Sequence, residues 1–207
     1  AMWCRLGQRG VEVYSWENFG HDWNIDAGEQ LPLKDKKLIK AEYGELPDFS
    51  DSNSDNDIVF TWNCTTAGVR IKNTDWISDQ RKVLTICDAT SAVFSMHMDC
   101  DKLDVITFSW QKVLGSEAAH GMLILSPRAV ERLETFTPPW PIPKIFRLAN
   151  NQKLISGIFS GATINTPSMI SVEDVLNSLN WGLELGGLNK LIDISETNLK
   201  LVNNWID

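Results

Sequence analysis

The amino-acid sequence predicts an α/β fold in which helices cover both faces of a mostly parallel or mixed sheet (α/β/α). Short runs of β-branched and aromatic residues alternate with longer mixed segments along the 207-residue chain. Most of these runs are apolar at almost every position, as in strands that are buried on both faces. Hydrophobic residues make up 43% of the chain and charged residues 22%, which is enough apolar material for a sizeable core.

Six segments have the composition of strands, because each is short, apolar and rich in β-branched or aromatic residues. In chain order they are residues 11–16, 36–43, 57–62, 82–90, 103–110 and 121–126. Ligands of parallel sheets bind at the carboxyl ends of the strands. We therefore expect functional residues where the strands at 57–62, 82–87 and 103–109 end.

Two segments between the predicted strands have helical character. They are residues 21–31 and 73–82, with Asp22 and Thr74 as possible N-caps. These two segments supply the helices that we expect to pack against the sheet.

A clearer helix follows the last strand, at residues 126–136. Ser126 suits the N-cap, and Pro127 suits the first helical position, which needs no N–H donor. Residues 137–143 contain four of the eight prolines of the chain and cannot continue a helix. An amphipathic pattern then predicts a long helix at 168–187 that ends at a Gly-Gly pair, and the helical pattern resumes after it.

The overall charge and the cysteines exclude several classes of protein. The net charge is −8, so the chain lacks the basic surface that nucleic acids or anionic membranes attract. No stretch approaches the roughly 20 apolar residues of a membrane span. The four cysteines form no CxxC pair and no Cys/His ligand spacing, which argues against a metal site. Unpaired cysteines are typical of a reducing compartment, so we expect a cytoplasmic protein.

Polar residues follow two of the predicted strands. The strand at 57–62 runs into a segment of amide, hydroxyl and small residues, namely Asn63, Thr65, Thr66 and Gly68. Taken alone, an ordinary polar turn accounts for that segment best. The strand at 82–87 ends at Asp88, whose carboxylate would lie at the boundary of the core and need a donor or cation there. Asp88 could equally be the N-cap of a following helix.

Lys112 follows the strand at 103–109. A lysine at a buried strand end loses hydration, which lowers its pKa and makes the neutral amine available as a nucleophile. The alternative is a lysine whose ammonium reaches the solvent along the rim. An aspartate at one strand end and a lysine at the next together suit pyridoxal phosphate, because the aspartate can hold the pyridine nitrogen protonated while the lysine binds the aldehyde.

The segment around these two residues resembles a known enzyme family. Residues 88–134, which include "TFSWQKVLG" and "AAHG", resemble phosphoserine aminotransferase, a fold-type I pyridoxal-phosphate enzyme of the class V aminotransferase group. The resemblance continues through residues 10–23, 62–77, 138–148 and 157–181, so it covers nearly the whole chain. Cys64 and Ser116 depart from the pattern, since glycine is expected at both positions.

The resemblance implies a role for each matching residue. Lys112 would bind the cofactor aldehyde and act as general base and acid, and Asp88 would pair with the pyridine nitrogen. Trp23 would stack on the ring, Thr65 would lie beside its phenolic oxygen, and Gln111 would help to hold the phosphate. Asn165 and Thr166 would reach the phosphate of the neighbouring subunit. The working unit would therefore be a homodimer with shared active sites.

The implied reaction transfers the amino group of glutamate to 3-phosphohydroxypyruvate, giving 2-oxoglutarate and O-phosphoserine for serine biosynthesis. The family's chain is longer than this one, with an N-terminal segment and a C-terminal small domain in addition. We therefore expect residues 1–187 to form an incomplete pyridoxal-phosphate-binding large domain. Residues 188–207 would be a connecting helix toward the small domain.

Two alternatives stay open at this point. The first is another class V aminotransferase, such as one acting on serine or alanine with glyoxylate. The second is an inactive partial α/β domain in which Asp88 only caps a helix and Lys112 only reaches the solvent.

Overall fold

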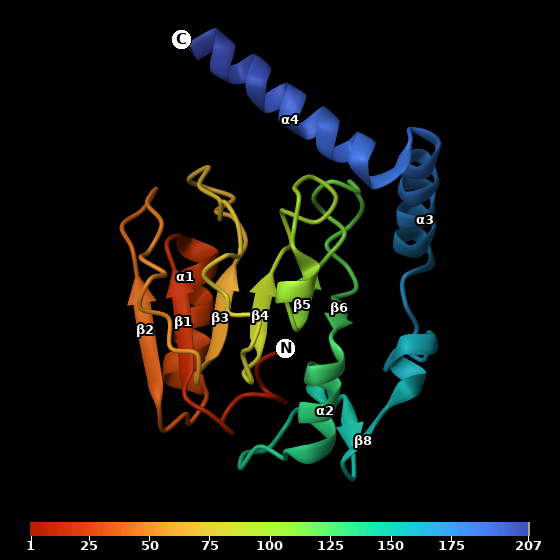
Figure 1. Cartoon of the computed structure of the whole chain (residues 1–207). Helices are drawn as coiled ribbons and strands as arrows, with labels where there is room; N and C mark the ends of the chain where they lie inside the picture. Colours follow the sequence, from red (N-terminus) through yellow and green to blue (C-terminus); the bar gives the residue numbers. More distant parts are fainter. Residues whose placement is uncertain (207) are drawn as a thin grey trace. The chain divides into compact units, whose positions relative to one another are not determined.

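Six strands form one sheet in the computed structural model, which describes residues 1–206. Their order across the sheet is β2–β1–β3–β4–β5–β6 (Figure 1). Neighbouring strands from β2 to β5 all pair in parallel, which confirms the mostly parallel sheet. The strands are β1 Val11–Ser15, β2 Lys36–Lys40, β3 Asp57–Thr61, β4 Thr85–Asp88, β5 Val105–Phe108 and β6 Met122–Leu125.

The sixth strand makes the sheet mixed. The amide of Ser126, just after β6, donates to the carbonyl of Asp104, just before β5, at 2.8 Å. The end of β6 therefore lies beside the start of β5, and β6 runs antiparallel to it. All six predicted strands are present, each shorter than its predicted range by one or more residues.

Residues 1–206 contain four α-helices. The predicted N-cap Ser126 is confirmed, because its hydroxyl accepts from the Ala129 amide at 3.2 Å. Ser168 caps α3 in the same way, with its hydroxyl accepting from the Ser171 amide at 3.4 Å. Gly186 separates the last two helices, with a left-handed φ of 119° that glycine tolerates. The helices are α1 Asn18–Ile25, α2 Pro127–Thr135, α3 Met169–Glu184 and α4 Gly187–Ile206.

Short elements complete the described chain. A π-helical turn extends α1, three 3₁₀ turns lie in the connections, and a two-stranded hairpin follows the proline-rich segment. They are η1 Asp26–Gln30, η2 Cys100–Lys102, η3 Lys144–Phe146, η4 Ser156–Ser160, β7 Ala149–Asn150 and β8 Lys153–Leu154.

The first helix begins earlier than predicted, and Asp22 is not its N-cap. Glu17 takes that place, since its carboxylate accepts from the Gly20 amide at 2.6 Å. A glutamate is an unusual N-cap, which is why the sequence pattern misses it.

The helix expected at residues 73–82 does not form. Individual side chains of this segment bond instead to residues from other parts of the chain. Thr74 Oγ1 donates to Asp99 at 3.1 Å, and Arg81 pairs with buried Asp104 at 3.4 Å. Trp76 is held by ring contacts with Tyr14 and other aromatic residues. These contacts outweigh a weak local helical preference.

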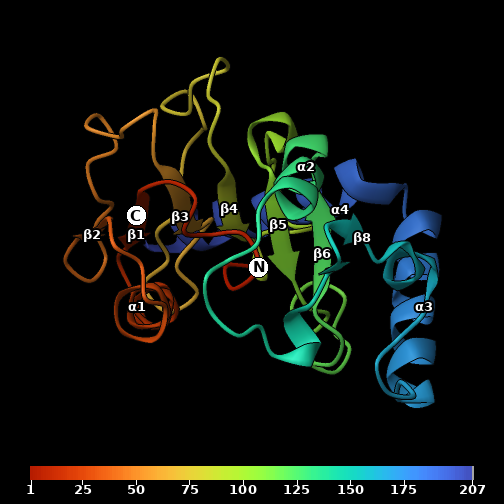
Figure 2. The same cartoon turned by 90° about the horizontal axis from the view of Figure 1, so that it is seen from below.

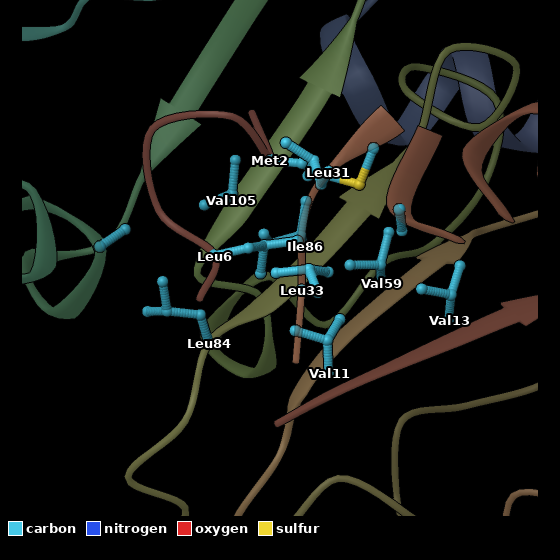
Figure 3. Close-up of a cluster of buried hydrophobic side chains, with 12 residues drawn as sticks. Met2, Leu6, Val11, Val13, Leu31, Leu33, Val59, Leu84, Ile86 and Val105 are labelled. Carbon is cyan, nitrogen blue, oxygen red and sulfur yellow. The ribbon is translucent and has the colours of Figure 1, made fainter. Parts of the chain in front are cut away.

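The main core lies against one face of the sheet. Every second residue of β1, β3 and β4 points into it, as the period of a strand requires. Side chains from the first turns of the chain and from η1 and α2 fill the remaining space (Figure 3). The buried members are Met2, Leu6, Val11, Val13, Ala27, Leu31, Leu33, Val59, Leu84, Ile86, Val105 and Ala129.

Aromatic side chains cover the other face of β1 and β3. Phe49 and Trp76 come from loops, and their rings stack with centroids 4.5 Å apart. They also contact rings that alternate with the core residues along the strands, namely Tyr14, Trp16 and Phe60. Helix α1 lies on the opposite side of the sheet from these loops (Figure 2).

The chain divides into two compact units. The first contains residues 1–88, 99–107 and 123–164, and the second contains residues 89–98, 108–122 and 165–206. Two of the boundaries fall at the carboxyl ends of β4 and β5. No helix among residues 1–206 has both the length and the apolar composition that crossing a membrane requires.

Candidate active site at the carboxyl edge of the sheet

Three neighbouring parallel strands end in a row of polar residues. Thr61, the last residue of β3, pairs in register with Asp88, the last residue of β4. Asp88 pairs in turn with Thr107 of β5. The main chain is joined at the same level, because the Trp62 amide donates to the Asp88 carbonyl at 2.8 Å. Asp88 is thus at the centre of the edge where ligands of parallel sheets bind.

Helix α1 provides a hydrogen-bond donor to this carboxylate. The indole N–H of Trp23 donates to Asp88 Oδ2 at 3.2 Å, and both side chains are half-buried. Asp88 does not cap a helix, because residues 89–98 form turns closed by the bonds from the Ala92 and Val93 amides to the Ala89 carbonyl. Two of the predicted site residues are therefore in contact.

The residue before Asp88, Cys87, has an unreactive thiol. Burial, followed by the charge of Asp88 and the nearby Cys100, raises the pKa of the Cys87 thiol well above its usual value. Because the thiolate is the reactive form, this buried thiol acts as a small apolar side chain beside Asp88.

Thr65 lies exposed in a loop that leaves and rejoins the sheet edge. The Cys64 amide donates to the Val69 carbonyl at 2.6 Å, and Cys64 Sγ accepts from the Ala67 amide at 3.0 Å. Glycine, which the resemblance leads us to expect at position 64, has no side chain to accept this second bond. The cysteine therefore helps to close the loop that presents Thr65.

Lys112 is exposed and lies in a turn beyond the end of β5. The expectation of a lysine at a buried strand end is wrong, because β5 stops at Phe108. The turn is closed by the Gly115 amide, which donates to the Lys112 carbonyl at 3.0 Å, and Gly115 has a left-handed φ of 66°. The turn therefore leaves the Lys112 side chain open to solvent.

Two buried polar atoms of the same loop have no hydrogen-bond partner among residues 1–206. They are Gln111 Oε1 and His120 Nε2. His120 also has a left-handed φ of 60°, and its ring lies 4.9 Å from that of Trp110. Unpaired buried polar atoms and strained backbone both concentrate at functional sites. The only signal of His120 in the sequence is its closeness to Lys112.

Asn165 and Thr166 are exposed in the segment that precedes α3. The loop of Lys112 contacts the start of this helix, because Ser116 Oγ donates to the Ser171 carbonyl at 3.4 Å. Serine thus makes a bond here that the glycine expected at position 116 could not make.

The predicted site residues are divided between the two units. Trp23, Thr65 and Asp88 belong to the first unit, and Gln111, Lys112, Asn165 and Thr166 belong to the second. Within residues 1–206, no cluster of three or more His, Cys, Asp or Glu side chains could hold a metal ion. The predicted site residues of the first unit thus carry a carboxylate, an indole and a hydroxyl, which suit an organic cofactor.

Comparison with known proteins identifies the family. The family model described as aminotransferase class-V matches residues 53–185, which is more than half of the chain. The chain belongs to the class V aminotransferases. Among these enzymes it is 56% identical over 211 residues to the phosphoserine aminotransferases of Methanosarcina mazei and Methanosarcina barkeri. These alignments cover 99% of the chain but 57% of each relative, so it spans little more than half of their length.

Solved structures of aminotransferases share this fold. A phosphoserine aminotransferase from Cytophaga hutchinsonii superposes with a TM-score of 0.82 at 20% identity, covering 99% of this chain and 56% of that one. An alanine–glyoxylate aminotransferase from Nostoc superposes with a TM-score of 0.71 at 15% identity, covering 93% and 52%. These similarities confirm the predicted fold-type I aminotransferase architecture.

Proposed function

We propose that this class V aminotransferase chain carries the cofactor-binding part of a phosphoserine aminotransferase. The enzyme would transfer the amino group of glutamate to 3-phosphohydroxypyruvate, giving 2-oxoglutarate and O-phosphoserine in serine biosynthesis. The observation that carries the proposal is the contact of Trp23 with Asp88 at the carboxyl edge of β4. The 56% identity to two phosphoserine aminotransferases supports this substrate pair over glyoxylate-dependent transamination.

The residues of the edge fit pyridoxal phosphate. When bound, this cofactor supplies an aldehyde that reacts with amines and a pyridine ring that withdraws electrons. The Asp88 carboxylate would accept a hydrogen bond from the protonated pyridine nitrogen, Trp23 would cover the ring, and Thr65 would face its phenolic oxygen. A structure described as pyridoxal-phosphate-bound phosphoserine aminotransferase, from Trichomonas vaginalis, has the same fold with a TM-score of 0.66 at 15% identity, covering 93% of this chain and 52% of that one.

The loop after β5 would supply the basic group. The amine of Lys112 would hold the cofactor aldehyde and, when released, accept and return the proton of the substrate Cα. An exposed amine can meet both partners without moving buried side chains. Gln111 would donate to the cofactor phosphate through its side-chain amide.

The site would be completed by a second copy of the chain. Asn165 and Thr166 would reach the cofactor phosphate of the neighbouring subunit, so the enzyme would be a cytoplasmic homodimer. Residues 1–187 would form the large domain and residues 188–207 the connection toward a small domain. The exposure of Asn165 and Thr166 is consistent with such a role.

The absorbance of bound cofactor tests this proposal. The protein, expressed at the full length that its gene encodes, should give a yellow band with pyridoxal phosphate that is lost in Lys112→Ala. The matched control is Lys153→Ala, which removes another exposed lysine, in β8. Identical spectra for wild type and Lys112→Ala would contradict the proposal that Lys112 binds the cofactor.

The amino donor separates the two candidate reactions. Phosphoserine should convert the yellow band to the absorbance of the aminated cofactor, whereas alanine should convert it far more slowly. Faster conversion by alanine would instead identify a glyoxylate-type aminotransferase.

A further inference from the structure

Two residues that lie one helical turn apart hold α1 on β1, and both contact Ser15. A Cβ atom on Gly20 would lie 3.2 Å from Ser15 Cβ and 3.3 Å from Ser15 Cα, so the helix approaches the strand closely there. Asn24, which follows on the same helix face, donates a hydrogen bond from Nδ2 to Ser15 Oγ. The position of α1 along the sheet is therefore fixed at Ser15.

This hydrogen bond is shielded from water. Asn24 is 2% exposed and Ser15 3% exposed. The other polar atom of the amide, Asn24 Oδ1, is also buried and has no hydrogen-bond partner among residues 1–206. A buried asparagine that is only partly satisfied destabilises the fold, which suggests that its role lies in placing the helix.

The side chain next to Asn24 makes the contact that matters at the sheet edge. Trp23 donates to Asp88 on β4, whereas Asn24 bonds to Ser15 on β1, and β3 lies between these strands. The Trp23–Asp88 distance of 3.2 Å is at the upper limit for a good N–H···O bond. A small shift of α1 would therefore break it.

We propose that Asn24 is a positioning residue that holds Trp23 against Asp88 through its hydrogen bond to Ser15. The inference rests on the proposed function, because Asp88 would hold the pyridine nitrogen. Asn24 does not touch the cofactor in this account. It acts through the position of α1, and displacing an active-site group by about 1 Å can cost a factor of a hundred.

A double-mutant cycle on cofactor affinity tests this relationship. Asn24→Ala and Trp23→Phe should each weaken pyridoxal phosphate binding by roughly tenfold to a hundredfold. If Asn24 acts through Trp23, the double variant should be no weaker than the weaker single variant. Ser15→Ala removes the same bond from the strand side and should reproduce Asn24→Ala. Additive losses in the cycle would overturn the proposal.

The control removes the hydroxyl hydrogen bonds of a buried threonine elsewhere on the same sheet. Thr85, at the opposite end of β4 from Asp88, donates from Oγ1 to the Lys102 carbonyl at 2.6 Å. Thr85→Val should lower the urea midpoint and leave cofactor affinity unchanged. If Asn24→Ala behaves in the same way, its role is structural only and the proposal fails.

A crystal structure of Asn24→Ala without cofactor tests the inference independently of the proposed function. The distance from Trp23 Nε1 to Asp88 should exceed about 3.5 Å, beyond hydrogen-bond range. A retained contact would overturn the positioning role. A wild-type protein that gives no band with pyridoxal phosphate would contradict the proposed function instead.

Discussion

The indole nitrogen of Trp23 lies 3.2 Å from a carboxylate oxygen of Asp88, although 65 residues separate them in the chain. The contact places a donor on the side chain that would hold the cofactor's pyridine nitrogen. A half-buried carboxylate that accepts a hydrogen bond from a helix side chain is positioned before any ligand arrives, which reduces the entropy lost on binding.

Asp88→Asn should weaken cofactor binding while keeping the shape of the site. The amide oxygen can still accept from Trp23, but the negative charge that would hold a proton on the pyridine ring is lost. We expect affinity for pyridoxal phosphate to fall roughly tenfold to a hundredfold, measured by absorbance titration. Asp79→Asn changes an exposed aspartate paired with Lys102 and should have no effect. Equal affinities of the two variants would contradict the role of Asp88.

Arg132→Ala should be among the most destabilising substitutions in the first unit. Arg132 of α2 binds Asp57 of β3 at 2.7 and 3.2 Å, and both side chains are buried. Removing one partner leaves an uncompensated buried charge, so we expect a loss of about 3–5 kcal/mol in the free energy of unfolding. Urea denaturation measures it.

Arg128 provides the matched comparison. It pairs with Asp104 at 2.9 Å, but its side chain is 35% exposed, and Asp104 keeps other donors from Thr85 and Ser126. Arg128→Ala should therefore cost about 0–1 kcal/mol. A larger loss for Arg128→Ala than for Arg132→Ala would contradict the burial argument.

Tyr14 should make the protein less stable at alkaline pH. Burial, followed by the charge of Glu12, raises the pKa of Tyr14 above its usual value. The Tyr14 hydroxyl donates a hydrogen bond to Glu12 Oε2 at 3.0 Å. The folded state then holds the phenolic proton more tightly than the unfolded state does. This contribution is fully present below the unfolded pKa of about 10 and is lost as the pH rises above it.

Tyr14→Phe should remove that part of the pH dependence. Urea unfolding between about pH 9 and 11 should give a shallower decline in stability for the variant, because one titrating group is gone. Parallel declines in the two proteins would show that Tyr14 ionises equally in both states.

Two glycines of the Lys112 loop should respond differently to alanine. Gly115 has a φ of 66°, whereas Gly121 does not have left-handed backbone, and an added Cβ at either would meet no atom within 4 Å. Gly115→Ala should cost about 1–2 kcal/mol through backbone strain alone and displace the turn that carries Lys112. Gly121→Ala should be nearly neutral. Thermal unfolding compares them, and similar losses would mean that left-handed strain is not the cause.

The strands could be predicted from the sequence because apolar runs of β-branched residues report burial directly. Helix α2 could be predicted for a similar reason, since Ser126 and Pro127 are local signals. The segment at 73–82 could not, because Thr74, Trp76 and Arg81 are held by residues from other parts of the chain. The sequence left the exposure of Lys112 open, because composition does not reveal where a short strand stops.

The residues of the candidate site were harder to predict from the sequence than the fold was. Asp88 stood out by its place after an apolar run, but its pairing with Trp23 depends on packing across the sheet. The Ser15–Asn24 bond gave no signal at all, because a serine and an asparagine nine positions apart are common in any chain. Family resemblance supplied the site residues that local patterns could not.

The exposed edge strand β2 has a consequence for how this protein behaves in concentrated solution. A free strand edge offers unpaired amide and carbonyl groups to any other strand that approaches. Lys36, Lys37 and Lys40 are exposed along this strand. An incoming copy of the same strand would bring three positive charges against these three, and their repulsion opposes extension of the sheet from one molecule to the next.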